Sequence, residues 1–181
     1  SLGGITALAA TCRGLDVAAL VLVDIVPKMN PAGVAKIRGF MMAHPNGFAS
    51  LEEAADAISA YYPDRPRPKD LSGLNKNLRL HPDGRYYWHW DLRMMTDQRA
   101  DPSQLIAMLD AADWTDRVPT LLVRGMKSDI VDDDGVEDLR RRIPKLEIAD
   151  IRGAGHMVAG DKNDEFNGAV IDFLRRVMPA G

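Results

Sequence analysis

Two kinds of apolar pattern follow one another along the chain. Continuous apolar runs rich in Val, Leu and Ile predict strands buried on both faces at residues 17–26 and 118–123, and a further strand is predicted at 146–151. Segments with helical spacing of apolar positions lie at residues 2–13, 32–43, 51–62, 103–112, 135–142 and 164–177. Because buried strands alternate with helices at both ends of the chain, we expect an α/β fold with a parallel sheet.

The segment between the first two predicted strands is mainly helical. It contains three prolines within Pro63–Lys69, which predict an extended connector. It also contains the sequence DGRYYWHW ending at Trp90, which is consistent with either a short strand or an exposed aromatic segment. We therefore expect a core formed by residues 1–27 and 117–181, with an insertion at 28–116. Sheets of this class form their binding sites at the carboxyl ends of the strands, where this insertion would begin.

Three short segments carry the candidate chemistry. SLGG at the start of the chain precedes a helix, GMKSD follows a predicted strand, and GAGH, ending at His156, follows another. The carboxyl ends of parallel strands meet at one edge, so Ser1, Asp129 and His156 are predicted to come together. A serine hydroxyl becomes a nucleophile when a histidine takes its proton and a carboxylate orients that histidine. Gly3 and Gly4 leave room for a tight turn against the neighbouring helix.

Other acidic residues compete with Asp129 for the role of the acid. Asp24 ends the first predicted strand and is the alternative. The three aspartates at 132–134 are predicted to cap the next helix and to complement its dipole. Asp161 and its neighbours are predicted to cap the last helix, with one of them a candidate for steadying the histidine loop.

These segments resemble the α/β-hydrolase superfamily, and in particular its members with a cap domain. The nucleophile elbow of that family is G-x-S-x-G, and its triad runs in the order Ser, acid, His. Here GMKSDIV resembles the acid loop and GAGHMV the histidine loop, while DGRYYWHWD and AGDKND are similar to segments of esterase-like and cofactor-free peroxidase-like members. The resemblance covers nearly the whole chain as the carboxyl-terminal part of the fold, and it implies a mainly helical cap insertion.

The resemblance implies a serine hydrolase. Ser1 would attack an ester-like bond of a small hydrophobic substrate and form an acyl-enzyme, with His156 as base and Asp129 as its partner. The backbone N–H of Leu2, at the amino end of a helix, would give half of the oxyanion hole. Apolar substrate contacts are expected from Trp88, Trp90 and Met157.

Several alternatives and exclusions accompany this hypothesis. A C–C bond hydrolase or lyase on the same fold would need a basic anchor such as Arg85 or Arg93, and a non-catalytic binding protein is a further alternative.

The net charge of −3 gives no reason to expect nucleic acid or a membrane surface as partner, and the single cysteine, Cys12, excludes an internal disulfide and a multi-cysteine zinc site. No cofactor or metal is implied.

The beginning of the chain carries a separate expectation. The family has strands before the nucleophile, so we expect a missing amino-terminal segment of the same protein as a partner, either as a second chain or as a preceding stretch of the same chain. The alternative is that Ser1 is an amino terminus released by processing, with its own amine as base. Without a signal-peptide pattern we expect a cytoplasmic location. The sequence leaves the oligomeric state open.

Overall fold

The computed structural model describes residues 2–63, 65–91, 102–114 and 118–178, which form two compact units. The larger unit consists of residues 1–35 and 100–181, and the smaller one of residues 36–99. Each unit has a core of its own. The smaller unit lies within the stretch 28–116 that the sequence predicts as an insertion.

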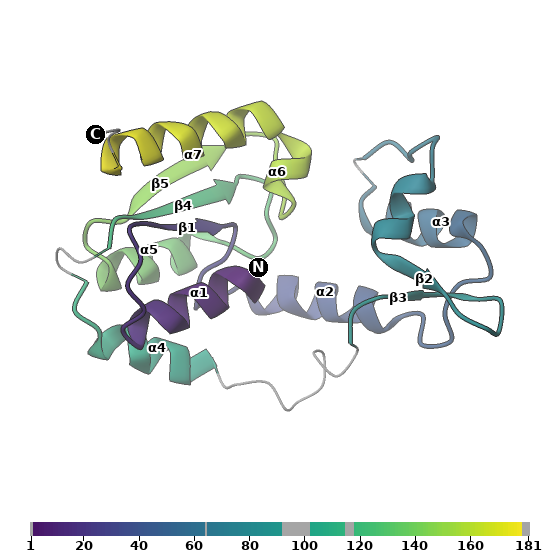
Figure 1. Ribbon diagram of the computed structural model, residues 1–181, viewed down its shortest axis with the longest axis horizontal. Coiled ribbons are helices and arrows are strands. Elements are labelled where there is room, and N and C mark those ends of the chain that lie inside the picture. Colours follow the sequence, from purple (N-terminus) through teal and green to yellow (C-terminus); the bar gives the residue numbers. More distant parts are fainter. Residues whose placement is uncertain (1, 64, 92–101, 115–117, 179–181) are drawn as a thin grey trace. The chain divides into compact units, whose positions relative to one another are not determined.

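The larger unit is built on a three-stranded parallel sheet in the order β1-β4-β5. The strands are β1 (Leu20–Val23), β4 (Thr120–Gly125) and β5 (Glu147–Ile151). Its helices are α1 (Leu2–Cys12), α4 (Pro102–Ala111), α5 (Asp133–Arg142), α6 (Val158–Asp161) and α7 (Asn163–Val177). Figure 1 shows α7 along one face of this sheet, with α1 and α5 on the opposite side. The predicted alternation of parallel strands and helices is confirmed.

Two sequence predictions are corrected here. The first strand is shorter than the predicted 17–26, because Asp24 has a φ of 47° and this left-handed conformation ends the extended backbone at Val23. Helix α4, which the sequence assigns to the insertion, belongs to the larger unit. It packs against α1 and buries Leu109 to 1% exposure.

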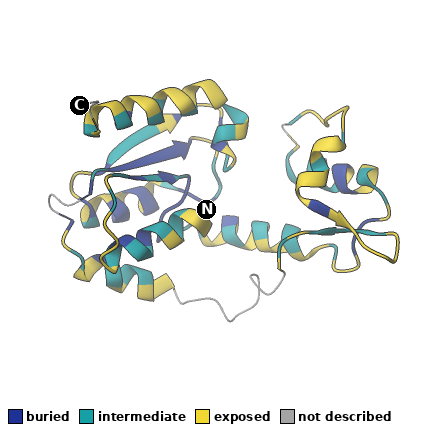
Figure 2. Cartoon of the chain, viewed as in Figure 1, coloured by how far each residue is buried: buried dark blue, intermediate teal, exposed yellow. Residues whose placement is uncertain are grey.

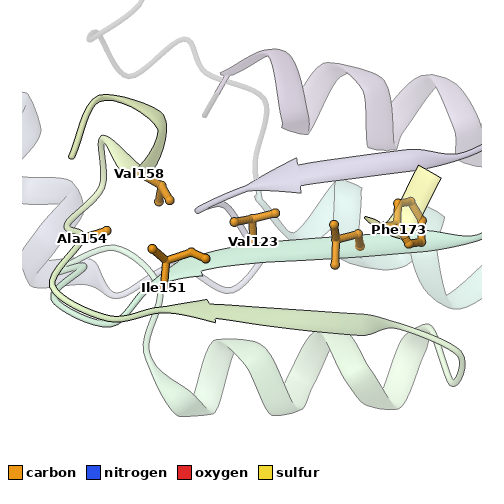
Figure 3. Packing of buried hydrophobic residues seen from close by; sticks show 6 residues of the cluster. Val123, Ile151, Ala154, Val158 and Phe173 are labelled. Carbon is orange, nitrogen blue, oxygen red and sulfur yellow. The ribbon is translucent and has the colours of Figure 1, made fainter. Parts of the chain in front are cut away.

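The core of the larger unit connects the sheet to the segment around His156. Alternate residues of β4, Leu121 and Val123, point toward α7 and pack with Phe173, which is fully buried. The same cluster includes Ala154 and Val158, on either side of His156 (Figure 3). Figure 2 shows β4 as buried along its whole length. The exposed residues of α7 lie on the side of that helix that faces away from the sheet. Apolar packing thus fixes the chain both before and after the histidine.

The smaller unit contains an antiparallel strand pair and a capped helix. Its elements are α3 (Leu51–Tyr61), the 3-10 helix η1 (Ser72–Lys76), β2 (Leu78–Leu80) and β3 (Tyr86–Trp88). The hydroxyl of Ser50 accepts the N–H of Glu53, and the Glu53 carboxylate accepts the N–H of Ala49, so the two side chains cap the start of α3. Of the two alternatives for residues 84–90, the structure shows the short strand, β3. The sequence analysis did not identify β2 or η1.

Helix α2 (Pro31–Met42) starts on the larger unit and is fixed there by its first turn. The Oδ1 atom of Asn30 accepts the N–H groups of Ala32 and Gly33, and its Nδ2 donates to Asp132, the N-cap of α5. Gly33 packs so tightly that a Cβ atom there would lie 1.8 Å from the carbonyl oxygen of Asp129. Only glycine fits at this contact. Among the described residues, no helix is both long and apolar enough to cross a membrane.

The contact at Gly33 predicts a clear difference between two glycines of the same helix. Gly33→Ala should lower the free energy of unfolding by about 2 kcal/mol or more, because backbone atoms must move to admit the methyl group. Gly39→Ala, with nothing within 4 Å of the added Cβ, is the matched control. It should instead raise stability by roughly 0.5–1 kcal/mol through helix propensity. Urea unfolding of both variants tests this, and equal effects would contradict the contact.

Candidate active site

The candidate site is centred on the carboxylate of Asp24, directly after β1. This residue is 0% exposed, and three groups surround its side chain. Its Oδ1 accepts the N–H of Gly125 at 2.9 Å, and its Oδ2 accepts the hydroxyl of Ser128 at 2.5 Å. The same Oδ2 lies 2.8 Å from Nδ1 of His156. A buried carboxylate requires such partners, and here they come from two loops at the carboxyl edge of the sheet.

The hydrogen bonds determine which ring nitrogen of His156 carries a proton. The oxygen of Ser128 accepts the N–H groups of Ile130 at 3.1 Å and Val131 at 3.3 Å, so its own proton is directed to Asp24. A carboxylate that receives this proton and the N–H of Gly125 is an acceptor, and Nδ1 of His156 must then be the donor. In the neutral ring, Nε2 keeps a lone pair and can accept a proton. The arrangement suits a general base oriented by an acid.

The histidine loop, residues 153–157, is held by backbone contacts and one carboxylate. Lys127 N–H donates to the carbonyl of Ala154 at 2.8 Å, and Gly155 N–H donates to Oδ2 of Asp161 at 2.8 Å. Asp161 thus steadies the histidine loop, as the sequence suggested for one acid in this region. The His156 side chain is 13% exposed, and Met157 beside it is 49% exposed. The loop therefore presents a largely buried base next to an accessible apolar side chain.

The amino end of α1 packs close to the acid. A Cβ atom at Gly4 would lie 2.7 Å from Cγ2 of Ile25, the residue that follows Asp24, and 3.7 Å from Cδ2 of Leu22. Leu2, the first residue of this 11-residue helix, therefore stands at the end of α1 that contacts the chain around Asp24. The first N–H groups of a helix have no carbonyl partner within it, and they create positive potential. Such groups stabilise a developing oxyanion.

The structure corrects the predicted partner of the histidine. The expected pair was His156 with Asp129, whereas His156 is hydrogen-bonded to Asp24, the alternative acid. The reason is the turn closed by the N–H of Ser128 and the carbonyl of Gly125, which places residue 128 rather than 129 against Asp24. The backbone carbonyl of Asp129 lies instead against α2 at Gly33. The signal for Asp24 was present in the sequence, because it is the only charged residue in the apolar run 17–26.

The other predicted site residues fall in different parts of the chain. Ser1 lies outside the described residues, as does Arg93. Trp88 and Trp90 belong to the smaller unit, where their rings stack with centroids 4.4 Å apart. The Arg85 guanidinium donates to the carbonyls of Asn46 and Gly47, so in this structure it holds a loop of the smaller unit. Among the described residues, no group of three His, Cys, Asp or Glu side chains is arranged to bind a metal ion.

Comparison with known proteins identifies the family. The sequence profile of the alpha/beta hydrolase family matches residues 1–169. The chain belongs to this alpha/beta hydrolase family. The predicted resemblance and fold class are therefore confirmed, and the described strands and helices are those of an alpha/beta hydrolase sheet with its flanking helices.

Solved structures of other alpha/beta hydrolases resemble the chain over nearly its whole length. E-2-(acetamidomethylene)succinate hydrolase matches with a TM-score of 0.78 and 20% identity, over 96% of this chain and 64% of that protein. An alpha/beta hydrolase of Novosphingobium aromaticivorans matches with a TM-score of 0.72 and 24% identity, over 97% and 63%. An esterase of Mycobacterium tuberculosis matches with a TM-score of 0.72 and 29% identity, over 99% and 61%. The chain spans less than two thirds of the length of each of these proteins.

The packing between the two loops predicts the effect of a small substitution at Gly125. A Cβ atom there would lie 2.3 Å from the carbonyl oxygen of Gly155 and 2.7 Å from that of Ala154, so Gly125→Ala must displace the histidine loop. We expect a loss of about 1–3 kcal/mol in the free energy of unfolding. The NMR signals of the His156 ring should shift as well.

The matched control for this substitution is Gly160→Ala in α6. An added Cβ at Gly160 meets nothing within 4 Å, so this variant should leave the signals of the His156 ring in place. An unchanged ring signal in Gly125→Ala would contradict the close contact between the two loops.

Proposed function

We propose that the chain carries the nucleophile, acid and base of a serine hydrolase that cleaves an ester-like bond of a small hydrophobic substrate. The observation that carries this proposal is the hydrogen bond between Asp24 and Nδ1 of His156, which leaves Nε2 available as a base. Membership of the alpha/beta hydrolase family and the similarity to an esterase support the same reaction class. The acid in the proposal is Asp24, and Asp129 has no catalytic role.

The proposed reaction proceeds in two acyl transfers. Nε2 of His156 takes the proton of the Ser1 hydroxyl as Ser1 Oγ attacks the carbonyl carbon, and Asp24 stabilises the imidazolium that forms. The tetrahedral intermediate collapses, the bond to the alcohol breaks, and Nε2 returns the proton to the leaving oxygen. Water then attacks the acyl-enzyme with Nε2 again as base, which releases the carboxylic acid and restores Ser1. All of these steps run without a metal or an organic cofactor.

The assignment of Ser1 rests on the sequence and on the position of α1. Ser1 directly precedes α1, whose first turn packs beside Ile25 and so near the acid. In this proposal the N–H of Leu2 donates one hydrogen bond to the oxyanion of each tetrahedral intermediate. Gly4, which has no side chain, allows α1 to approach Leu22 and Ile25 closely.

A second oxyanion donor is proposed to come from an amino-terminal segment of the same protein. The chain spans less than two thirds of the proteins it resembles, and β1 pairs with a described strand, β4, along one edge only. The opposite edge has backbone groups available for a further strand. We propose that this segment continues the sheet next to β1.

The apolar substrate contacts are proposed from the apolar or aromatic character of three side chains. Met157 is half exposed beside His156, which suits contact with the acyl or alcohol part of an apolar ester. In the smaller unit, Trp88 and Trp90 stack on each other, and Trp88 meets Phe48 edge to face at 5.3 Å. Contact of the two tryptophans with an apolar substrate stays a proposal from the sequence alone.

A fluorophosphonate probe tests the nucleophile. Such a probe reacts with activated serine hydroxyls, so peptide mass spectrometry of the full protein should find the probe on Ser1. Ser1→Ala and His156→Gln should each abolish labelling, because one removes the nucleophile and the other its base. Labelling of a different serine, or unchanged labelling of His156→Gln, would contradict the proposed triad.

A pair of aspartate variants tests the acid. Asp24→Asn should lower kcat for a small aryl ester by about 10³- to 10⁴-fold, because an amide no longer stabilises the imidazolium and favours the wrong tautomer. Asp129→Asn is the matched control and should retain nearly all activity. Stopped-flow or steady-state kinetics on both variants shows which aspartate is the acid. A larger loss of kcat in Asp129→Asn than in Asp24→Asn would assign the role to Asp129.

A further inference from the structure

Ser128 contacts the acid in a way that none of the proposed steps uses. Its hydroxyl lies 2.5 Å from Oδ2 of Asp24, the same oxygen that meets Nδ1 of His156. The position of Oδ2 therefore depends on two groups, one from each loop. A hydrogen bond to a charged group is among the stronger polar interactions in proteins.

The direction of the Ser128 hydroxyl is fixed by its other contacts. Its oxygen accepts the N–H groups of Ile130 and Val131, two residues that are 1% and 3% exposed. Both lone pairs are used, and the single proton is left for Asp24. Ser128 thus has two separable roles, because it accepts hydrogen bonds from its own loop and donates one to the acid.

We propose that Ser128 is a positioning residue for the reaction, acting through Asp24. Its donated hydrogen bond holds Oδ2 where that atom accepts the Nδ1 proton, and so keeps Nε2 of His156 as the free base. The inference rests on the proposed function, because it assigns Ser128 a role within the same site. The hydroxyl contacts the acid rather than the substrate, so its loss should affect kcat and leave substrate binding unchanged.

Four variants of the full protein separate this role from a structural one. Ser128→Ala removes the hydroxyl, Ser128→Thr keeps it, and Ser128→Cys replaces it with a weaker donor of similar size. The matched control is Thr120→Val. Thr120 is a buried hydroxyl residue on β4, and its hydroxyl donates to the carbonyl of Val118 at 3.0 Å rather than to Asp24.

Two readouts apply to each variant. The first is kcat and KM for a small aryl ester. The second is the NMR signal of the His156 ring in protein labelled with ¹⁵N-histidine, which reports the tautomer and the Nδ1 hydrogen bond. The signal is assigned by its absence in His156→Gln.

Ser128→Ala should lower kcat about tenfold, within the range for loss of one hydrogen bond to a charged group, with KM changed less than about twofold. The Nδ1 proton signal should move or broaden. Ser128→Thr should restore kcat and the signal, and Ser128→Cys should lie between the two. If Ser128→Ala does not fold, kcat and the His156 ring signal of Ser128→Cys test the role of Ser128 instead. Thr120→Val should change stability alone.

The remaining outcomes separate the two proposals. Unchanged kcat and ring signal in Ser128→Ala would overturn the role of Ser128 and leave the proposed hydrolase intact. Equal losses of kcat in Ser128→Ala and Thr120→Val would also overturn it, because both would then reflect stability. If the unmodified protein cleaves no ester but Ser128→Ala still changes the His156 signal, the positioning role stands and the proposed reaction fails.

Discussion

The buried carboxylate of Asp24 is the interaction on which the rest of the site depends. Burial of a charge without partners would cost several kcal/mol, so the fold must bring donors to it. The donors are Gly125 at the end of β4, Ser128 in the turn after it, and His156 after β5. The same contacts that make burial possible also orient the imidazole. Stability and the candidate chemistry therefore share one set of hydrogen bonds.

The second constraint is that segments of the chain pack closely against one another at glycine residues. Gly125 lies against the carbonyls of the histidine loop, Gly33 lies against the carbonyl of Asp129, and Gly4 lies against Ile25. Each of these glycines brings a different segment to the loops that surround Asp24. A side chain at any of them would separate segments whose spacing determines the hydrogen bonds described above. The protein interior has little free volume to absorb such a shift.

Much of the fold could be predicted from the sequence, because β1 and most of β4 are continuous apolar runs and the long helices have regular apolar spacing. The exceptions have physical reasons. Helix α4 lies within the predicted insertion but packs on α1, a tertiary contact that its own periodicity does not reveal. Strand β2 has only three residues, and two of them are exposed, so it has no apolar run. The contact that places α4 is distant in sequence, whereas β2 is short and pairs with the nearby strand β3.

The candidate site was predicted in part. The loops that carry His156 and Ser128 were identified, because short glycine-containing segments follow buried strands. The acid was assigned to Asp129 because its spacing from Gly125 resembled the family's acid loop, but spacing does not determine which residue of a turn faces a neighbouring strand. The turn from Gly125 to Ser128 decides this, and it directs residue 128 to Asp24. The single charged residue in the apolar run 17–26 was the better indicator of the acid.

The backbone of Asp24 has a consequence for how this position tolerates sequence change. With a φ of 47°, it occupies a conformation that glycine adopts freely, that asparagine and aspartate tolerate, and that β-branched residues strongly disfavour. Glutamate would keep the charge but has a longer side chain and less tolerance for this conformation. Selection for folding at this position would therefore accept glycine or asparagine, whereas selection for a carboxylate in contact with His156 accepts aspartate alone. A library screened separately for folding and for activity would return different residues at this one position.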